Sequence, residues 1–256
     1  MTKSKVYKEP VYYEIAFGFV DPVEQVNLIE NFIEQYSERS VERFLDIACG
    51  PGLQILEIAE RGFDAVALDN SPEMLDYLEL KAEEKGVSVS TVQSDMRNFD
   101  LKSKVDCAFI MMGTINLVES NEDFLRHLDS VGSSMKKGGL YLMENFAGLG
   151  WFNEDIFNKT SWKEARNGIK VDASYETVLL DSMDQKVRET MKLKVDDNGE
   201  EMKFEEIEET KLIFPQELEV LVRMNGSFEM VGWFEQSSTK ELEKPSTKNI
   251  VVLRKK

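Results

Sequence analysis

Cysteine and histidine are scarce in this chain of 256 residues. It contains two cysteines, Cys49 and Cys107, and a single histidine, His127. No CxxC pair and no Cys/His spacing typical of zinc is present, so we expect no metal site. We expect the cysteines to be small buried residues in a reducing compartment. His127 falls on a predicted helix, away from the strand ends, and is expected to have a surface or packing role and no catalytic one.

Long apolar runs are absent too. No stretch approaches the ~18 apolar residues that indicate a membrane span, and no charged-then-apolar leader is visible. We therefore expect a cytoplasmic protein without membrane contact. The length, with 42% hydrophobic residues, suits one α/β domain with an elaboration.

Basic residues are outnumbered by acidic ones, 31 to 48, which gives a formal net charge of −17. Nucleic-acid binding depends mainly on lysine and arginine contacts to phosphates, so we expect no nucleic-acid partner. A small molecule, or a basic peptide, fits better, because a negative field favours a cationic cofactor or amine. Acidity that serves solubility alone is an equally good explanation of the charge.

The stretch Phe44 to Gly52, FLDIACGPG, predicts a strand, a tight loop and the start of a helix. The apolar strand breaks at Asp46 into small residues, Ala48, Gly50 and Gly52, whose backbone can approach a ligand closely. In an open parallel sheet this turn lies at the carboxyl end of the first strand, where ligands bind. A dinucleotide fingerprint needs a third glycine where this chain has Leu53, which disfavours NAD.

Helices and strands are predicted to alternate along the first 150 residues. The first helix is predicted to begin at Asp21-Pro22, with Val23 on its apolar stripe. Two later helices are predicted to begin at Leu53 and at Ser71, and a further helix is predicted over about 122–131. The remaining strands are expected over 65–68, from Val87 to Thr91, over 105–112 and, after Gly138-Gly139, over 140–143. This rhythm predicts an α/β fold with a doubly wound, mostly parallel, Rossmann-like sheet.

The pattern changes to period two between Ile169 and Phe214, with turns at Asp184-Gln185 and Asp197-Asn198-Gly199. These features predict an inserted small antiparallel sheet over 151–211, either a lid or a dimer surface. The core is then 1–150, including an amino-terminal lid, together with 212–256. In this last part we predict a helix over 215–225 and a hairpin, 228–234 and 249–253, that completes seven strands in the main sheet.

Three carboxylates are predicted at the carboxyl ends of three successive strands: Asp46, Asp69 and Asp95. They should point into one crevice. Asp69 follows Gly52 by 17 residues, where an acidic residue can accept both ribose hydroxyl protons. In the alternative interpretations, Asp69 caps a helix, Asp95 is a turn residue, and Asp46 accepts hydrogen bonds from loop amides.

Taken together, these residues resemble the motifs of class I S-adenosylmethionine-dependent methyltransferases, with Ala48 where that family more often has glycine. The resemblance covers about 13–145 and the chain from 215 onward. It implies that Asp46 organises the methionine pocket, that Asp95 and Met96 contact the adenine, and that Met111 offers its carbonyl to the cofactor amine. The implied S-adenosylmethionine-binding residues are Asp46, Ala48, Gly50, Gly52, Asp69, Asn70, Met74, Asp95, Met96 and Met111. Met74 and Met111 are core side chains in the alternative interpretation.

The acceptor side is less specific. Tyr13 resembles the family's lid tyrosine, where its ring would attract a sulfonium or ammonium, although plain helix packing explains it equally well. Glu144 could orient or deprotonate an amine, or only cap a loop, and these two are the candidate catalytic residues. Further candidates near the crevice are Tyr12, Glu14, Thr114, Asn116, Asn145, Trp151, Phe152, Trp162 and Tyr175.

We therefore predict methyl transfer from S-adenosylmethionine to a nitrogen or oxygen of a small-molecule acceptor, giving S-adenosylhomocysteine. The alternatives are an S-adenosylmethionine-binding protein without catalysis, an NAD-dependent oxidoreductase, and a protein or peptide methyltransferase. The oxidoreductase is disfavoured by Leu53 and by the lack of a placed general acid such as a Tyr-x-x-x-Lys pair. The acceptor and a homodimer are left open.

Overall fold

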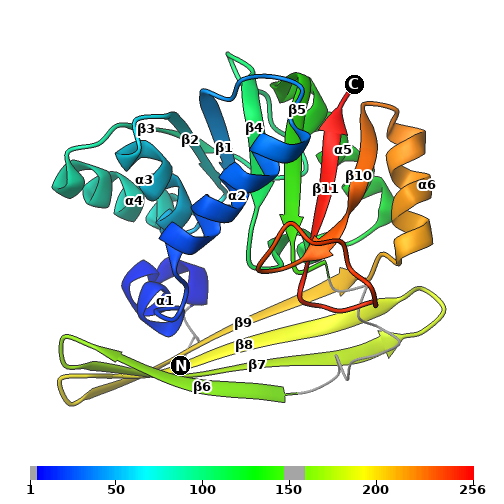
Figure 1. Cartoon of the computed structure of the whole chain (residues 1–256). Coiled ribbons are helices and arrows are strands. Elements are labelled where there is room, and N and C mark those ends of the chain that lie inside the picture. Colours follow the sequence, from blue (N-terminus) through cyan, green and yellow to red (C-terminus); the bar gives the residue numbers. More distant parts are fainter. Residues whose placement is uncertain (1–4, 147–158) are drawn as a thin grey trace.

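A computed structural model describes residues 5–146 and 159–256, and it has an α/β core and a separate antiparallel sheet (Figure 1). The core sheet has seven strands in the order β10-β11-β5-β4-β1-β2-β3. Five of them pair in parallel: β1 (Arg43–Ile47), β2 (Asp64–Asp69), β3 (Val89–Gln93), β4 (Val105–Ile110) and β5 (Met135–Glu144). The hairpin β10 (Phe228–Glu235) and β11 (Asn249–Lys255) extends the sheet beside β5 in antiparallel fashion. The predicted seven-stranded, mostly parallel sheet is confirmed.

Helices cover both faces of this sheet. One face is packed by α2 (Pro22–Tyr36), α3 (Leu53–Glu60) and α4 (Pro72–Lys85), and the other by α5 (Asn121–Ser134) and α6 (Pro215–Asn225). Successive side chains of a strand point to opposite faces. In β1, accordingly, Phe44 joins the cluster under α2–α4 while Leu45 and Ile47 join the cluster under α5 and α6. Burial on both faces explains why these strands read as continuous apolar runs.

The helix starts follow the predicted capping chemistry. The Asp21 carboxylate accepts the backbone N–H groups of Val23 and Glu24, and the Ser71 hydroxyl accepts that of Met74. These caps satisfy amides that have no partner within the helix. The sequence therefore determines where the helices that flank the crevice begin.

Several details of the predicted helices and strands were wrong. Val23 is 45% exposed, and the buried stripe of α2 begins at Val26. Strand β4 ends at Ile110, because Met112 adopts a left-handed backbone conformation with φ 58°. Strand β5 starts at Met135 and runs through the two glycines, where a Cβ on Gly139 would lie 2.1 Å from the Asp106 carbonyl oxygen.

The second sheet, here called the outer sheet, has four antiparallel strands in the order β6-β7-β8-β9. They are β6 (Lys159–Arg166), β7 (Ile169–Asp181), β8 (Lys186–Asp197) and β9 (Glu200–Lys211). The predicted antiparallel insert is confirmed, whereas β6 is a strand that the period-two pattern did not indicate. Trp151 and Phe152 lie outside the described residues.

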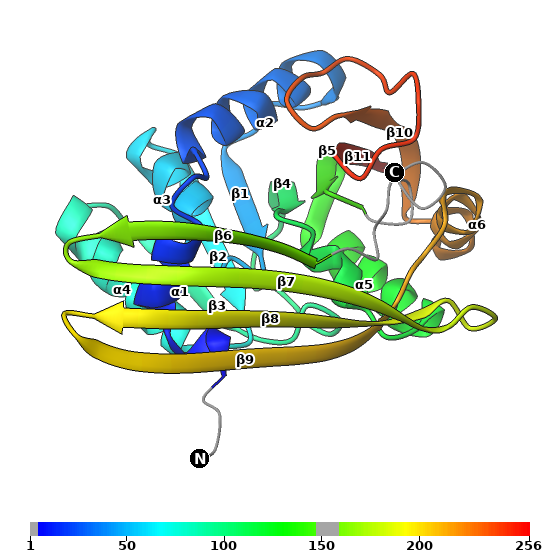
Figure 2. The same ribbon diagram turned by 90° about the horizontal axis from the view of Figure 1, so that it is seen from below.

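The outer sheet lies across the carboxyl ends of the parallel strands (Figure 1), and Figure 2 shows its strands running side by side over the core. The amino-terminal elements η1 (Val6–Lys8) and α1 (Pro10–Ala16) pack between the outer sheet and the core. A third apolar cluster joins them to this sheet: Val6, Ile15, Ala16, Val171, Ala173, Met191, Leu193, Val195 and Phe204. The sheet is thereby fixed above the crevice.

Candidate functional site

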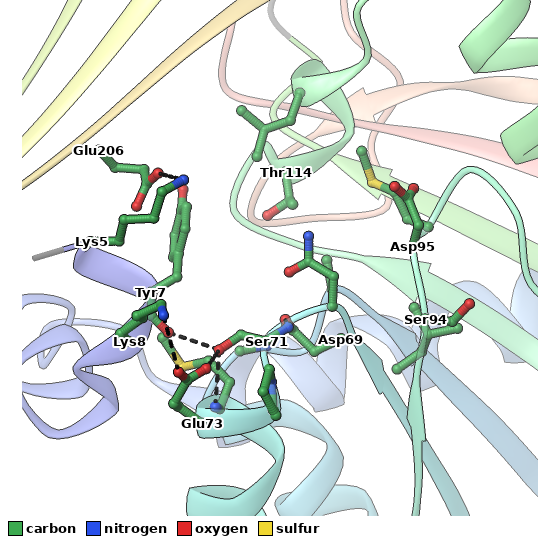
Figure 3. Close-up of a pocket in the computed structure, with 18 of the residues that line it drawn as sticks. Lys5, Tyr7, Lys8, Asp69, Ser71, Glu73, Ser94, Asp95, Thr114 and Glu206 are labelled. Carbon is green, nitrogen blue, oxygen red and sulfur yellow. Dashed lines mark hydrogen bonds and ion pairs between the residues drawn. The ribbon is translucent and has the colours of Figure 1, made fainter.

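A cavity of about 460 Å³ lies between the carboxyl ends of the core strands and the outer sheet. This volume is within the range of small-molecule sites. Figure 3 shows Asp69, Thr114 and Glu206 reaching it from three separate segments of the chain. Its lining includes Lys5, Tyr7, Tyr13, Ala48, Gly50, Asp69, Asn70, Met74, Asp95, Met96, Arg97, Thr114, Glu206 and Glu208.

Asp69 is the last residue of β2, and its carboxylate is hydrogen-bonded to the small-residue loop. One carboxylate oxygen accepts the Gly50 N–H at 2.8 Å and the other accepts the Ser71 N–H at 2.9 Å. Burial raises the pKa of Asp69, and these backbone amides act in the opposite direction. A carboxylate oxygen has a further lone pair beyond each such bond. Asp69 can therefore position the loop and still accept hydroxyl protons from a ligand, whereas the helix itself is capped by Ser71.

The small residues of the loop have different roles. Ala48, Gly50 and Gly52 all have positive φ, of 54°, 52° and 78°. The left-handed conformation is unfavourable for alanine, which explains physically why glycine is more usual at the place of Ala48. Gly52 is not among the cavity-lining residues: a Cβ there would lie 2.1 Å from Leu78 Cδ1, so Gly52 lets α3 and α4 approach.

Asp46 lies in a narrow second cavity of about 30 Å³, which it shares with Tyr13, Ala48, Gln54 and Met111. Its side chain is buried, and among the described residues no group donates a hydrogen bond to its Oδ2. Burial and the neighbouring Asp69 raise the pKa of Asp46 well above its usual range. An unpaired buried carboxylate is unfavourable, so this position favours a cationic or hydrogen-donating ligand group.

Asp95 is engaged by its neighbour. Its carboxylate accepts hydrogen bonds from Arg97 Nε at 2.9 Å and Nη2 at 2.6 Å, and the guanidinium lowers the pKa of Asp95. Arg97 also pairs with Glu119 at 2.7 Å. The carboxylate lines the cavity, but a ligand there would share it with Arg97.

His127 supports this loop from the core. Its Nδ1 lies 2.8 Å from the Met96 carbonyl oxygen and its Nε2 lies 2.6 Å from the Tyr141 hydroxyl. The ring is fully buried, and burial lowers the pKa of His127 to about 4. The surface role is therefore wrong and the packing role is correct. Its helical spacing from Phe124 and Val131 was the available signal.

Glu144 does not contact the cavity. It is buried at the end of β5, where one oxygen accepts the Met112 N–H at 2.7 Å and the other accepts Gln236 Nε2 at 2.9 Å and Gln25 Nε2 at 3.3 Å. It is not among the residues that line either crevice cavity. We therefore correct its expected role: Glu144 positions the Met111-Met112 turn and is not placed to touch an acceptor.

Tyr13 lines both cavities. Its ring lies 4.6 Å from that of Phe17 and 5.9 Å from that of Tyr7. Burial raises the pKa of Tyr13, with a contribution from Asp69. The hydroxyl therefore stays protonated at neutral pH, so Tyr13 can supply an aromatic face or a hydrogen bond but no base.

The other predicted residues divide between the site and its support. Met74, Asn70 and Met96 line the larger cavity, Met111 lines the narrow one, and Thr114 lines both. Further from the cavity, Tyr12 donates to Asp197, Trp162 donates to the Ala16 carbonyl, and Asn116 donates to the Asn145 carbonyl. Glu14 lines the narrow cavity and pairs with Arg166 at 2.6 Å and with Tyr77.

The sequence reasoning missed Lys5, Tyr7, Glu206 and Glu208. The two glutamates lie on β9, on the same face as the buried Phe204. Carboxylates at the inward positions of a period-two strand were the signal that could have identified them.

No helix within 5–146 and 159–256 is both long and apolar enough to cross a membrane. In the same two ranges, no three His, Cys, Asp or Glu side chains are grouped as they would be around a metal ion.

Comparison with known proteins agrees with this geometry. Residues 44–139 match a family described as "Methyltransferase domain". Glycine/sarcosine N-methyltransferase of Halorhodospira halochloris is 28% identical over 122 residues, 46% of each chain. Ubiquinone biosynthesis O-methyltransferase of Rickettsia canadensis is 29% identical over 110 residues, 43% of this chain and 46% of the relative. The chain thus matches about half the length of such curated relatives.

Solved structures match over nearly the whole chain. An S-adenosylmethionine-dependent methyltransferase from Clostridium acetobutylicum has a TM-score of 0.77 at 19% identity, covering 95% of this chain and 96% of its own. The sugar N-methyltransferase KedS8 from Streptoalloteichus has a TM-score of 0.76 at 16% identity, covering 100% and 95%. Residues 44–139 thus match the methyltransferase domain family, and the chain has the fold of these solved S-adenosylmethionine-dependent methyltransferases.

Proposed function

We propose that this protein transfers the methyl group of S-adenosylmethionine to a nitrogen or oxygen of a small molecule and releases S-adenosylhomocysteine. The observation that carries the proposal is the crevice at the ends of β1, β2 and β3. There Asp46, Asp69 and Asp95 surround a loop of small residues with left-handed backbone. Relatives named as N- and O-methyltransferases support the same reaction.

The residues present fit the methyl donor. The Asp69 carboxylate would accept the ribose hydroxyls, with Asn70 beside it, and the Asp95-Met96 segment with Met74 would hold the adenine. Asp46, with its unpaired Oδ2, and the Met111 carbonyl would hold the amino-acid end. Ala48 and Gly50 let the backbone approach, and Gly52 acts through helix packing.

The protein's part in the chemistry is positioning and exclusion of water. When bound, the donor supplies an electrophilic methyl carbon, and the acceptor lone pair forms a new bond to it as the carbon–sulfur bond breaks, leaving the electron pair on sulfur. The outer sheet and η1 cover the cavity, and the Tyr13 ring lines both of its parts. An aromatic face beside a sulfonium is favourable through cation–π attraction.

A small acceptor is favoured over a protein or peptide because the outer sheet covers the crevice. We assign 1–150 and 212–256 to the catalytic core and 151–211 to the acceptor lid. Both cysteines, Cys49 and Cys107, are free and buried, which supports a reducing, cytoplasmic location. From the net charge, we predict that the protein has no nucleic-acid partner. From the strand pattern, we predict a homodimer formed through the outer sheet.

Calorimetric titration of S-adenosylmethionine, S-adenosylhomocysteine and NAD tests the donor assignment. We expect micromolar binding of the first two and a loss of ~1.5–3 kcal/mol in Asp69→Ala, because charged hydrogen bonds to the ribose disappear. Asp64→Ala is the matched control, since Asp64 begins the same strand and pairs at the surface with Arg43. Binding of NAD alone, or equal affinity in both variants, would refute the assignment.

Turnover separates an enzyme from a protein that only binds the donor. We expect S-adenosylhomocysteine to form in proportion to a methylated amine or alcohol. Tight donor binding without turnover on any amine, alcohol or peptide tested would favour the non-catalytic alternative.

A further inference from the structure

The inner face of the outer sheet changes character along its length. On β8 the inward residues Val195, Leu193 and Met191 are followed by Glu189 and then Val187. On β9 Phe204 is followed by Glu206 and Glu208 and then Thr210. The apolar half packs on η1 and α1 in the third core cluster. The acidic stretch lies over the crevice, where Glu206 and Glu208 line the cavity; Figure 3 shows the position of Glu206.

These carboxylates oppose folding. Glu189 and Glu208 are directly opposite each other in the antiparallel ladder of β8 and β9, and like charges in this arrangement are destabilising. Burial raises the pKa of Glu189 to about 7, and burial with repulsion from Glu206 raises the pKa of Glu208. Apolar residues would stabilise this face better, so a ligand is a physical reason for the charges.

Glu206 is the residue that points to the charge of the ligand. It is only 4% exposed and lines the cavity, and its Oε2 has no hydrogen-bond partner among the described residues. Its Oε1 accepts the Lys5 ammonium at 3.0 Å (Figure 3). Lys5 itself is 65% exposed. Arg97, which pairs with Asp95 and Glu119, is a second cation that acts on Glu208. The position already holds an ammonium group and has an unused acceptor.

Two tyrosines complete the surroundings. Burial, together with the three glutamates, raises the pKa of Tyr7 well above its usual range. Burial and Glu189 raise the pKa of Tyr175 in the same way, and the Tyr175 hydroxyl is hydrogen-bonded to the Glu189 carboxylate. The tyrosines therefore stay neutral. Aromatic rings beside carboxylates favour an organic cation over a neutral or anionic group.

We propose that Glu206 and Glu208, supported by Glu189, bind a positively charged amine of the acceptor substrate. This inference rests on the proposed methyl transfer and specifies its substrate class. Glu206 and Glu208 come from β9, whereas the donor residues come from the core strands and loops, so the two groups line the same cavity from separate elements. The Lys5 ammonium marks the rim of the amine site.

Matched probe pairs test the amine requirement. Benzylamine with benzyl alcohol, cyclohexylamine with cyclohexanol, and glucosamine with glucose are titrated by calorimetry, with and without saturating S-adenosylhomocysteine. We expect at least one amine to bind about tenfold or more tightly than its alcohol, since a charged hydrogen bond is lost in the alcohol. Equal binding within every pair, or no binding of any amine, would overturn the inference.

Charge-removing variants locate the site. Glu206→Gln and Glu208→Gln keep the side-chain size, and we expect each to weaken amine binding about tenfold or more. The dissociation constant of S-adenosylhomocysteine should stay within about twofold. Glu209→Gln is the control, because Glu209 lies on the outer face of β9 and pairs with Arg188 at 2.6 Å.

The outcomes separate the two proposals. If wild-type protein binds no S-adenosylhomocysteine, the proposed methyl transfer fails, and the amine titration without donor still reports on the carboxylates. Unchanged amine binding in both Glu206→Gln and Glu208→Gln would refute the amine site while leaving the donor assignment intact.

Discussion

The two ends of the core sheet treat buried carboxylates in opposite ways. At the end away from the crevice, Asp106 accepts the backbone N–H groups of Glu42 and Arg43 and pairs with Arg39 at 2.7 Å and Lys136 at 3.0 Å. These partners lower its pKa. At the crevice end, burial raises the pKa of Asp46 and of Asp69. One carboxylate stabilises the fold, and the others are left with capacity for a ligand.

The outer sheet repeats the crevice pattern. Glu189 and Glu206 are buried without full compensation, whereas Glu209 on the other face of β9 has its own arginine. Asp106 and Glu206 are both buried, so burial alone does not distinguish a structural carboxylate from a functional one. The distinction is whether the protein supplies the partners.

The largest effect is expected at the structural end. Asp106→Asn should lower the free energy of unfolding by about 3 kcal/mol, because two cations and two amides lose a buried charged acceptor. Urea denaturation followed by circular dichroism measures the change, with exposed Asp64→Asn as the control. A loss below about 1 kcal/mol would remove the contrast between the two ends.

Gly52→Ala tests the packing beneath the loop. The new Cβ would meet Leu78 Cδ1 at 2.1 Å, whereas Gly62→Ala has a similar φ of 88° and nothing within 4 Å. We expect a loss of about 2–3 kcal/mol for Gly52→Ala and about 1 kcal/mol for Gly62→Ala. Equal losses in urea denaturation would mean that the backbone conformation alone requires Gly52.

His127 predicts a pH dependence of stability. Its folded-state pKa of about 4 lies below the unfolded value, so its neutral form stabilises the fold fully above about pH 6.5, and this contribution is lost as pH falls toward 4. Between pH 7 and pH 5 the loss from this residue is about 2 kcal/mol. His127→Gln should lack this component in denaturation at the two pH values. An equal loss in the variant would contradict the assignment.

Asp46→Asn has the smallest expected effect on the fold. Removing a buried unpaired charge should leave the free energy of unfolding unchanged or raise it by about 1 kcal/mol. The affinity for S-adenosylhomocysteine should fall about tenfold, because its ammonium loses a carboxylate partner. Calorimetry and denaturation on the same preparation measure both. Strong destabilisation by Asp46→Asn would mean that Asp46, like Asp106, mainly stabilises the fold.

Local chemistry made much of this structure predictable. The apolar strands, the caps at Asp21 and Ser71 and the small-residue loop each depend on neighbouring residues, and the positions of Asp46 and Asp69 follow from strand ends. The environment of Glu144 could not be predicted, because Gln25, Met112 and Gln236 reach it from three distant segments. The contact of His127 with the Met96 carbonyl is likewise tertiary.

The outer sheet shows the same limit. Its turns and strand pattern were visible, but which face of β9 meets the crevice depends on how the sheet docks on η1 and α1. The sequence alone therefore did not indicate that Glu206 and Glu208 line the crevice.

A crystal structure of the protein with S-adenosylhomocysteine tests the central claim most directly. The ribose hydroxyls should lie within hydrogen-bond distance of the Asp69 carboxylate, the adenine beside Met96, and the ammonium group near Asp46. Glu206 should face the part of the cavity that the ligand leaves free. A ligand bound with its ribose away from Asp69, or with its ammonium group on Glu206, would contradict the account.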